Sequence, residues 1–433
     1  MKKVLVVAYY YPPMGMGGVQ RTAKFVRYLS DFGWEPTVLT VKPIHYYAHD
    51  NTLLEEVSGV RTIRTDSMDP LRLQFQFKRI LGKQNPSSSA SGKSSFLEKV
   101  NFNLSPWLFI PDTKIPWVPW AVHRAKQCLK KDSYDLIFTT SPPHSVHLVG
   151  RQLKKKTSIP WVADFRDNWL AEAYEKLPTP FHRMLNRQMA TSCVQQADHV
   201  IAICDPIADY LRQLSGKSAS DFTVLPNGFD RSDFDSVPVS GKNKKLTISY
   251  CGGLYPARSP EPFFKGLALA LNRLPAMADA IHIRFVGSIN GVPMAELINK
   301  YGLNNVVTTY GYVTHDESIR YLCSSDLLLL LISSDSSPGI VTGKVFEYLA
   351  SEKPVLGIVP QGEAAKLLVE HQRGWVVHPD DIEHIAQTLL KILEHYQKGK
   401  LMLAEDAGKS VAHLERYEQT RKLAALFDAI CNK

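Results

Sequence analysis

The sequence predicts an α/β protein built from two doubly wound domains, and three observations support that prediction. Short apolar runs alternate with helical stretches along most of the 433 residues. The alternation stops in a polar stretch at 233–245 and then starts again, which indicates a linker between two domains. The composition, with 44% hydrophobic and 21% charged residues, is ordinary for globular proteins and excludes a disordered chain or a fibrous repeat.

The first domain is expected to span residues 1–235. Its first apolar run, 3–8, is interpreted as a buried strand and not a signal peptide, because it lacks a small-residue cleavage site and soon reaches Tyr9. A helical spacing of apolar residues follows and ends near Gly33. Short buried strands between helical stretches imply a parallel sheet covered on both faces. Further strands are predicted at 36–41, 136–140, 160–163, 199–203 and 222–225.

The second domain is expected at 246–413, followed by a terminal segment, 414–433, that forms a helix. Ligands of doubly wound sheets bind at the carboxyl ends of the strands, so the loops there are the expected site. Strands are predicted at 246–250, 281–286, 306–309, 326–332, 354–359 and 374–377, and helices at 342–351, 381–395 and 414–430.

The segment 71–120 interrupts the pattern of the first domain. It contains a polar stretch, 84–93, that is expected to be a mobile loop. Basic and aromatic residues on either side of this stretch suit contact with an anionic lipid surface. The alternative is that the segment is a hydrophobic loop that covers a cleft between the two domains. Stacking on single-stranded nucleic acid is a third reading. The segment shows no RNA-domain signature, so no nucleic-acid partner is expected. The residues concerned are Arg72, Lys78, Arg79, Lys83, Trp107, Phe109, Trp117 and Trp120.

The net charge, the cysteines and the hydropathy limit which cellular compartment and which classes of partner are expected. The 51 basic and 42 acidic residues leave a net charge of +9, which suits anionic lipid, phosphate-bearing substrates or nucleic acid. The six cysteines have no metal-ligand spacing, which is typical of reduced thiols in a cytosolic protein. The strongly apolar run 327–332 has six residues, far fewer than the roughly 20 that cross a bilayer. We therefore expect a cytoplasmic protein.

The loop between the first strand and the first helix is the first candidate ligand site. Gly17 and Gly18 let backbone N–H groups approach an anion, and the helix N-terminus adds a partial positive charge. The spacing is not GxGxxG, and a tight strand-to-helix turn is the alternative.

Charged residues follow the strand at 160–163. Arg166 can neutralise a phosphate or a developing negative charge, while Asp164 and Asp167 can orient it or bind a hydroxyl. An ion-pair network that closes the strand end is the alternative. His144 follows another strand and is a further candidate for contact with a ligand.

The second domain carries the richer candidates. A glycine pair, Gly252 and Gly253, precedes Arg258, whose planar fork can bind phosphate oxygens; a surface arginine is the alternative. Further along the second domain, the buried strand predicted at 326–332 is followed by a loop of small residues and then by the helix predicted at 342–351. Lys344 lies in the first turn of this helix and Glu347 one turn later, so a phosphate and a ribose diol can be held on one face. A capping role for Glu347 is the alternative.

Together these segments resemble the family 4 retaining glycosyltransferases of the GT-B fold. The resemblance covers nearly the whole chain, and its pieces occur in the family's order. The pieces are residues 12–18, 164–167, 225–230, 252–258 and 344–350.

The resemblance implies two Rossmann-like domains that face each other across a cleft, with the last helix crossing back to the first domain. It implies a nucleotide-diphospho-sugar donor bound mainly by the second domain and an acceptor bound mainly by the first. Glu347 matches the glutamate that holds the donor ribose, and Arg258 matches the basic residue on the diphosphate. No metal or other cofactor is expected, because helix dipoles and basic side chains stabilise the leaving diphosphate.

The chain departs from the family pattern at three positions. Gly339 stands where the first of two paired glutamates is usual, Gly253 where an arginine is usual, and Arg166 where a histidine is usual. A subset of the family shares such changes, and Lys344 is the candidate for the missing second cation. The expected catalytic residues are Arg166, Asp167, Arg258 and Lys344. Donor contacts are expected from Gly17, Gly18, Gly252, Gly253, Arg258, Gly339, Ile340, Val341, Thr342, Lys344 and Glu347, and acceptor contacts from Asp164, His144, Asp112 and Trp117.

The leading functional hypothesis is transfer of a sugar, with retention, to a glycan or lipid-linked acceptor in the synthesis of a bacterial surface polysaccharide. Such a protein would be cytoplasmic, with peripheral attachment to the plasma membrane. A dinucleotide-dependent oxidoreductase requires a GxGxxG loop and an acidic residue about twenty positions later, and neither is found. A catalytically weak nucleotide-sugar-binding or scaffolding subunit is the remaining alternative, suggested by the altered glutamate pair.

Overall fold

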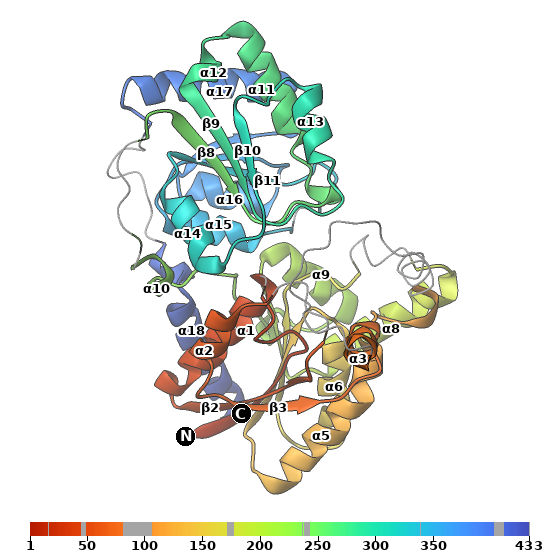
Figure 1. Cartoon of the computed structure of the whole chain (residues 1–433). Helices are drawn as coiled ribbons and strands as arrows, with labels where there is room; N and C mark the ends of the chain where they lie inside the picture. Colours follow the sequence, from red (N-terminus) through yellow and green to blue (C-terminus); the bar gives the residue numbers. More distant parts are fainter. Residues whose placement is uncertain are drawn as a thin grey trace. The chain divides into compact units, whose positions relative to one another are not determined.

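The computed structural model describes residues 1–15, 17–44, 49–80, 106–170, 177–235, 237, 243–337, 339–401 and 411–432. The predicted polar loop at 84–93, Lys83 and the centre of the predicted linker lie outside these residues. The chain forms two compact units, one of Met1–Pro226 with Arg416–Lys433 and one of Asn227–Glu415. Each unit has its own parallel sheet (Figure 1).

The first unit contains seven parallel strands in the order β3-β2-β1-β4-β5-β6-β7. Strand β3 was not predicted, because its sequence Arg-Thr-Ile-Arg-Thr has no apolar run. Its position at the sheet edge leaves most of its side chains only half-buried, so polar residues are tolerated there. The strands are β1 (Lys2–Val7), β2 (Trp34–Val41), β3 (Arg61–Thr65), β4 (Leu136–Ser141), β5 (Trp161–Phe165), β6 (His199–Ala202) and β7 (Phe222–Val224).

Helices cover both faces of this sheet. One apolar cluster joins it to α5, α6, α8 and α9, and a second joins it to α1 and α18. The terminal helix α18 belongs to this unit: the ring centroid of Phe427 lies 5.3 Å from that of Trp34 and 5.4 Å from that of Phe138. The helices are α1 (Gly17–Tyr28), α2 (Asn51–Glu56), α3 (Pro70–Ile80), α5 (Val118–Lys131), α6 (Ser145–Lys154), α8 (Pro180–Gln196), α9 (Asp205–Ser215) and α18 (Arg416–Cys431).

The second unit contains six parallel strands in the order β10-β9-β8-β11-β12-β13, again with apolar clusters on both faces. Its strands are β8 (Leu246–Cys251), β9 (Ile281–Val286), β10 (Val307–Tyr310), β11 (Leu327–Leu331), β12 (Val355–Ile358) and β13 (Gly374–Val377). Its helices are α10 (Ser232–Asp235), α11 (Glu261–Arg273), α12 (Met277–Ala280), α13 (Met294–Lys300), α14 (His315–Cys323), α15 (Gly343–Ala350), α16 (Glu363–Glu370) and α17 (Ile382–Gln397).

The chain enters the second unit at Asn227, earlier than the predicted boundary at residue 235. The reason is packing: Phe229 is buried in an apolar cluster of the second unit, and Phe234 packs against the same cluster.

Both sheets follow the strand order 3-2-1-4-5-6 of doubly wound folds, extended by β7 in the first unit. The order reverses between β1 and β4 in the first unit and between β8 and β11 in the second. Ligands of such sheets bind outside the carboxyl ends of the strands at this switch point. The loops after β1, β4, β8 and β11 therefore position the candidate sites.

Candidate functional site

Helix α15 presents two charged residues at the switch point of the second unit. Its apolar side chains pack into the core under the sheet, so helical spacing leaves Lys344 and Glu347 together on the other face. Both are half-buried. The loop after β8, with Gly252 and Gly253, leads into a short 3-10 helix that ends at Arg258. Sequence segments about ninety residues apart thus meet at one sheet edge, because β8 and β11 are neighbours.

The side chain of Lys344 crosses directly over Gly252. A Cβ atom at Gly252 would lie 1.7 Å from Cε and 2.3 Å from Nζ of Lys344, and the φ of Gly252 is +140°. Glycine is therefore required there both for space and for backbone conformation. The ammonium lies 5.4 Å from the centre of the Tyr250 ring, within the range of a cation–π contact.

Two tyrosine hydroxyls hold the loop after β8 and helix α15 together. The Tyr348 hydroxyl accepts a hydrogen bond from the Cys251 N–H at 3.0 Å and donates one to the Leu329 carbonyl at 3.2 Å. The Tyr250 hydroxyl donates to the Gly253 carbonyl at 3.0 Å. Neither tyrosine is among the predicted site residues. The available signal was a phenol in a buried element, helix α15 for Tyr348 and strand β8 for Tyr250, since a buried hydroxyl needs a partner.

Two cations share this site. The Arg258 side chain lies over the Tyr255 ring at 4.9 Å. Burial, and then the positive charge of Arg258, lower the pKa of Lys344 to about 7, although Glu347 acts in the opposite direction. Within the described chain no carboxylate forms an ion pair with either cation. Such a pair can bind an anion of two or more charges.

The loop before α15 supplies a further polar group. Thr342 occupies the N-cap position but its side chain makes no capping hydrogen bond, and its Oγ1 is buried without a partner among the residues that the structure describes. Ile340 is exposed, and Val341 packs against the apolar cluster. At Gly253, a Cβ would lie 3.2 Å from the Ser288 Oγ, so a long side chain would meet Ser288 at once. Lys344 lies beside the neighbouring glycine instead.

In the first unit, Arg166 is buried and binds the backbone. Its Nε donates to the Ser141 carbonyl, Nη1 to the Gly18 carbonyl, and Nη2 to the Pro142 carbonyl at 3.5 Å. Burial lowers the pKa of the guanidinium. Through these hydrogen bonds, Arg166 connects the loops after β1, β4 and β5 at the switch point. Gly17 and Gly18 begin α1, and a Cβ at Gly18 would meet open space.

Asp164 and Asp167 have different environments. The carboxylate of Asp164 is fully buried and accepts two hydrogen bonds from Arg21, at 3.0 and 3.1 Å, and one from Thr140 at 2.7 Å. Asp164 thus belongs to an ion-pair network that closes the strand end, which was the alternative interpretation of this segment. We therefore do not propose Asp164 as a ligand of the acceptor. Asp167 is exposed, and no ion pair engages it within the described ranges. It stays a candidate.

The other three predicted acceptor contacts are part of the framework. Trp117 is fully buried and donates to the Thr65 Oγ1 at 2.7 Å. Asp112 accepts from the Ser145 N–H at 2.9 Å and so caps α6. His144 is fully buried, its ring stacks on Trp169 with centroids 5.0 Å apart, and burial lowers its pKa to about 3. These side chains shape the unit from within.

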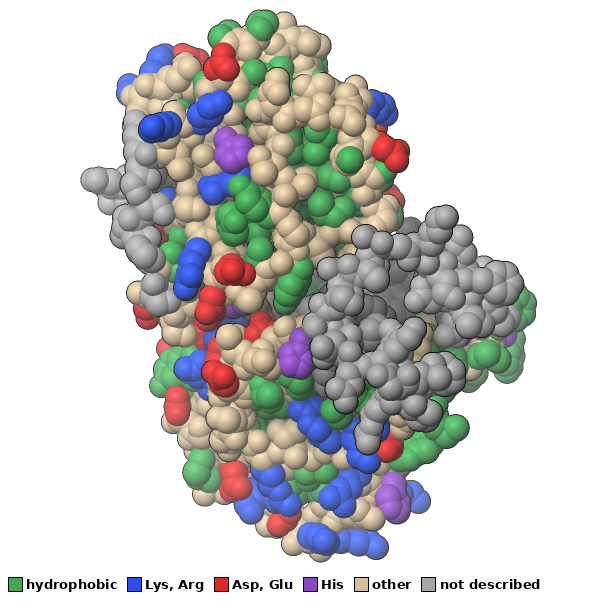
Figure 2. All heavy atoms as spheres, viewed as in Figure 1, with side chains coloured by type: hydrophobic (Ala, Val, Ile, Leu, Met, Phe, Trp, Pro, Cys, Tyr) green, Lys and Arg blue, Asp and Glu red, His purple; other side chains and the backbone are tan. Residues whose placement is uncertain are grey.

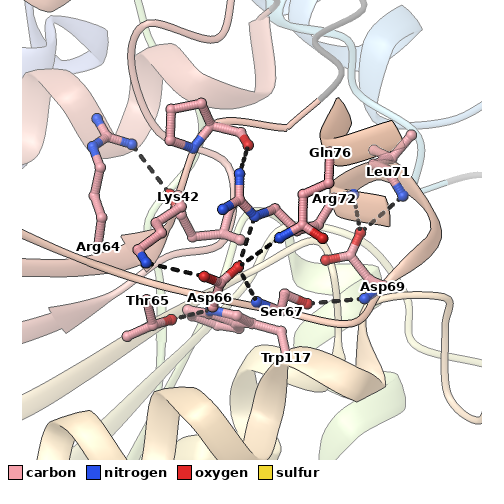
Figure 3. Close-up of polar contacts among 12 residues, drawn as sticks. Lys42, Arg64, Thr65, Asp66, Ser67, Asp69, Leu71, Arg72, Gln76 and Trp117 are labelled. Atoms are coloured by element: carbon pink, nitrogen blue, oxygen red, sulfur yellow. Dashed lines mark hydrogen bonds and ion pairs between the residues drawn. The ribbon is translucent and has the colours of Figure 1, made fainter. Parts of the chain in front are cut away.

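Arg72, expected to meet lipid headgroups, is buried instead (Figure 3). Its Nε donates to Asp66 at 2.8 Å and its Nη1 to the Pro43 carbonyl at 2.6 Å. Lys42 donates to the same carboxylate at 3.0 Å, and these cations, Arg72 first, lower the pKa of Asp66 to about 2. The network fixes the start of α3 to the ends of β2 and β3. The side chains of Lys78 and Arg79 lie outside the described part of the structure.

Two other kinds of feature, a metal-binding cluster and a membrane-spanning helix, are absent from the described residues. Among the residues described, no three His, Cys, Asp or Glu side chains are grouped to hold a metal ion. No helix in the same residues is long and apolar enough to span a membrane.

Two Rossmann-like units, with a terminal helix that returns to the first, make up the GT-B fold. The family model described as Glycosyltransferase Family 4 matches residues 89–233, and the model described as Glycosyl transferases group 1 matches residues 247–395. The chain therefore belongs to the family 4 glycosyltransferases, as the resemblance predicted. No curated protein matches the chain.

Several solved structures share the fold. A glycosyltransferase from Rickettsia africae is 16% identical, with a TM-score of 0.66 and coverage of 99% of this chain and 98% of that one. Anabaena Alr3699/HepE in complex with UDP is 15% identical, with a TM-score of 0.60 and coverage of 100% and 98%. WaaG, a glycosyltransferase involved in lipopolysaccharide biosynthesis, is 15% identical, with a TM-score of 0.59 and coverage of 99% and 98%.

Proposed function

We propose that this glycosyltransferase moves a sugar, with retention, from a nucleotide-diphospho-sugar to a glycan or lipid-linked acceptor. One observation carries the proposal: Arg258 and Lys344 share the switch point of the second unit without a carboxylate partner in the described chain, and Glu347 lies one helical turn beyond Lys344. A nucleoside diphosphate has the matching chemistry, with an anionic diphosphate beside a ribose diol.

Each residue has a distinct part in donor binding. Arg258 and Lys344 bind the diphosphate, the free Thr342 hydroxyl donates to a phosphate oxygen, and Glu347 accepts hydrogen bonds from the ribose hydroxyls. The similarly folded Anabaena protein was solved in complex with UDP, which supports a nucleotide as part of the donor.

Negative charge grows on the diphosphate as its bond to the sugar's anomeric carbon breaks. Two cations held in place before the reaction stabilise that charge without a metal ion, because no reorganisation is needed at the moment of bond cleavage. We expect activity to survive EDTA unchanged. A strict requirement for Mg²⁺ or Mn²⁺ would contradict this part of the proposal, and the anomeric configuration of the product, read by NMR, tests retention.

The first unit binds the acceptor. Asp167 is the exposed carboxylate beside the buried Arg166, and the start of α1 adds backbone N–H groups at the same switch point. The involvement of the similarly folded WaaG in lipopolysaccharide biosynthesis supports a bacterial surface glycan as product, made at the cytoplasmic face of the membrane.

The test begins with the donor. UDP-, GDP- and dTDP-sugars are screened for thermal stabilisation, since a ligand at 100 times its dissociation constant adds about 2.7 kcal/mol. Glu347→Ala should then weaken binding of the selected donor without changing the melting temperature of the free protein. The matched control is Glu370→Ala, at an exposed position of α16. Equal donor affinity in both variants would remove Glu347 from the ribose site.

A donor-binding subunit without strong catalysis is the second candidate. It is favoured by Gly339, which stands where the family's first glutamate is usual. Donor binding without detectable hydrolysis or transfer, over a panel of lipid-linked acceptors, would support this candidate over the enzyme.

A further inference from the structure

Four large apolar side chains are exposed in two short segments of the first unit. Trp107 and Leu108, in a helical turn at 106–108, are 55% and 69% exposed, and Phe181 and Met184, in the first turn of α8, are 62% and 50% exposed. We call these four residues the apolar rim. Single exposed apolar residues are ordinary on soluble proteins, whereas a group of large ones marks an interaction surface.

The two segments of the apolar rim are held side by side. Thr179 caps α8 by accepting a hydrogen bond from the His182 N–H, and its hydroxyl lies 2.7 Å from the His182 Nδ1. The Nε2 of His182 lies 3.3 Å from the Trp107 carbonyl oxygen, and the two rings meet edge to face at 5.8 Å. Phe181 and Met184 are three apart and so share one face of α8. The rim is therefore a preformed surface.

The charge of the protein is concentrated in the same unit. The first unit contains 33 Lys and Arg against 21 Asp and Glu, a net charge of +12, whereas the second contains 18 against 21, a net charge of −3. The difference predicts that an extended anionic surface would meet the first unit and not the second.

Within the first unit, one layer of helices has basic residues and no acidic ones. Helix α6 packs between α5 and α8, and none of the three contains Asp or Glu. Exposed basic residues include Arg124 and Lys131 on α5 and Arg183 and Arg187 on α8. Figure 2 shows Lys and Arg side chains spread over the surface where Figure 1 draws α5.

Sheet topology places the apolar rim at the carboxyl edge of the first sheet. Helix α8 precedes the parallel strand β6, so its first turn lies at the end where the neighbouring strands finish. The start of α6, the Arg166 loop and the start of α1 lie at the same edge. A surface in contact with the rim would thus reach the loops to which we assign the acceptor.

We infer that the apolar rim inserts into an anionic lipid bilayer, with the acid-free layer α5, α6 and α8 facing the headgroups. Trp and Phe at the headgroup boundary add apolar burial, and basic residues near the surface add an attraction that falls with salt. Attachment is peripheral and reversible. The inference rests on the proposed function only in its purpose, which is access to a lipid-linked acceptor; the binding itself requires no catalysis.

Sedimentation with vesicles tests the inference. The full chain is mixed with vesicles of phosphatidylcholine containing phosphatidylglycerol, and with vesicles of phosphatidylcholine alone. We expect binding to the anionic vesicles only, weakened by raised salt. The double variant Phe181→Ser/Met184→Ser should reduce the partition coefficient at least about tenfold. Arg187→Glu should weaken binding and its salt dependence.

The controls separate lipid binding from folding and from catalysis. Val369→Ser, at a 65% exposed position of the second unit, should bind vesicles like the unaltered protein. All variants should keep the same melting temperature and the same donor affinity, so failure of the donor assignment would leave this result standing. Equal vesicle binding by the rim variant and the control would overturn the inference. So would absence of vesicle binding together with self-association that the rim variant abolishes, because the rim would then be a protein interface.

Discussion

The two units have the same strand order but use their cations differently. In the first unit, Arg21 is paired with the buried Asp164 and Arg166 donates to three backbone carbonyls. In the second, Arg258 and Lys344 lie beside aromatic rings, and neither forms an ion pair within the described residues. A charge whose hydrogen bonds are already made within the protein holds loops in place, whereas a charge without a carboxylate partner is available to an anionic ligand.

The same contrast applies to net charge. The unit with the excess of +12 is the one we assign to the acceptor and the lipid surface, while the unit of −3 concentrates two cations at one point. Net charge therefore describes the partner of a whole surface, and the donor site has to be recognised from local geometry.

The largest expected effect is on the stability of the first unit. Asp164→Ala leaves the buried Arg21 without its carboxylate and should lower the free energy of unfolding by about 3–5 kcal/mol. Six of the seven tryptophans lie in this unit, so tryptophan fluorescence in urea follows its unfolding. Glu347→Ala, in the second unit, should leave the same transition unchanged. Similar losses of unfolding free energy in both variants would contradict the distinction between charges that hold the fold together and charges that are available to a ligand.

The next effect is on turnover. Arg258→Ala and Lys344→Ala should each lower kcat by about 10²–10³, the cost of about 2.7–4 kcal/mol seen when a preorganised charge-stabilising group is removed. Steady-state transfer with the donor found in the screen measures it. Lys353→Ala, in the loop after the same helix, is the control. A change in KM alone would show that the cations bind the donor equally in the ground state and the transition state.

A pair of glycine substitutions compares the two switch points directly. Gly252→Ala places a methyl group against Lys344 and requires alanine to adopt a φ of +140°. The value of kcat/KM should therefore fall at least about tenfold, which corresponds to about 1.4 kcal/mol in activation free energy. Gly18→Ala, where a Cβ meets open space, should have little effect. Equal activity of the two variants would contradict the assigned position of Lys344.

The smallest effect is on the pH dependence of donor binding. Because the pKa of Lys344 is about 7 in the free protein, the side chain is mostly neutral at pH 8, and a bound diphosphate will raise that pKa. Donor binding should therefore take up nearly one proton per protein molecule at pH 8 and only a small fraction of one at pH 6. Above pH 7, the affinity for the donor should fall by up to about tenfold per pH unit. Calorimetry in buffers of different ionisation enthalpy measures this uptake. Lys344→Arg, charged throughout, should show none.

Most of the fold was predictable, because strand and helix formation depend on local patterns. The apolar runs of β8, β9 and β11 and the helical spacing of α15 appear within a residue or two of their predicted bounds. Strand β3 was missed because an edge strand needs no apolar run.

The site was predictable only in outline. Lys344, Glu347 and Arg258 were predicted from their place after buried strands, and the structure brings their segments to one switch point; their roles in donor binding stay predictions. Tyr348 and Tyr250 were missed, because their roles depend on partners that local spacing does not reveal.

By itself, the sequence determined the two alternating α/β patterns, the order of the family's motifs and the excess of basic residues. Only the tertiary structure decided which charges are engaged and which surfaces are exposed. Asp164 and Glu347 are both carboxylates beside a cation in the sequence, yet Asp164 is paired with Arg21, 143 residues away. Arg72 and Trp117 looked suited to a membrane and are buried, whereas Phe181 is exposed. The physical reason is that burial and pairing depend on contacts between distant segments, which a local pattern does not encode.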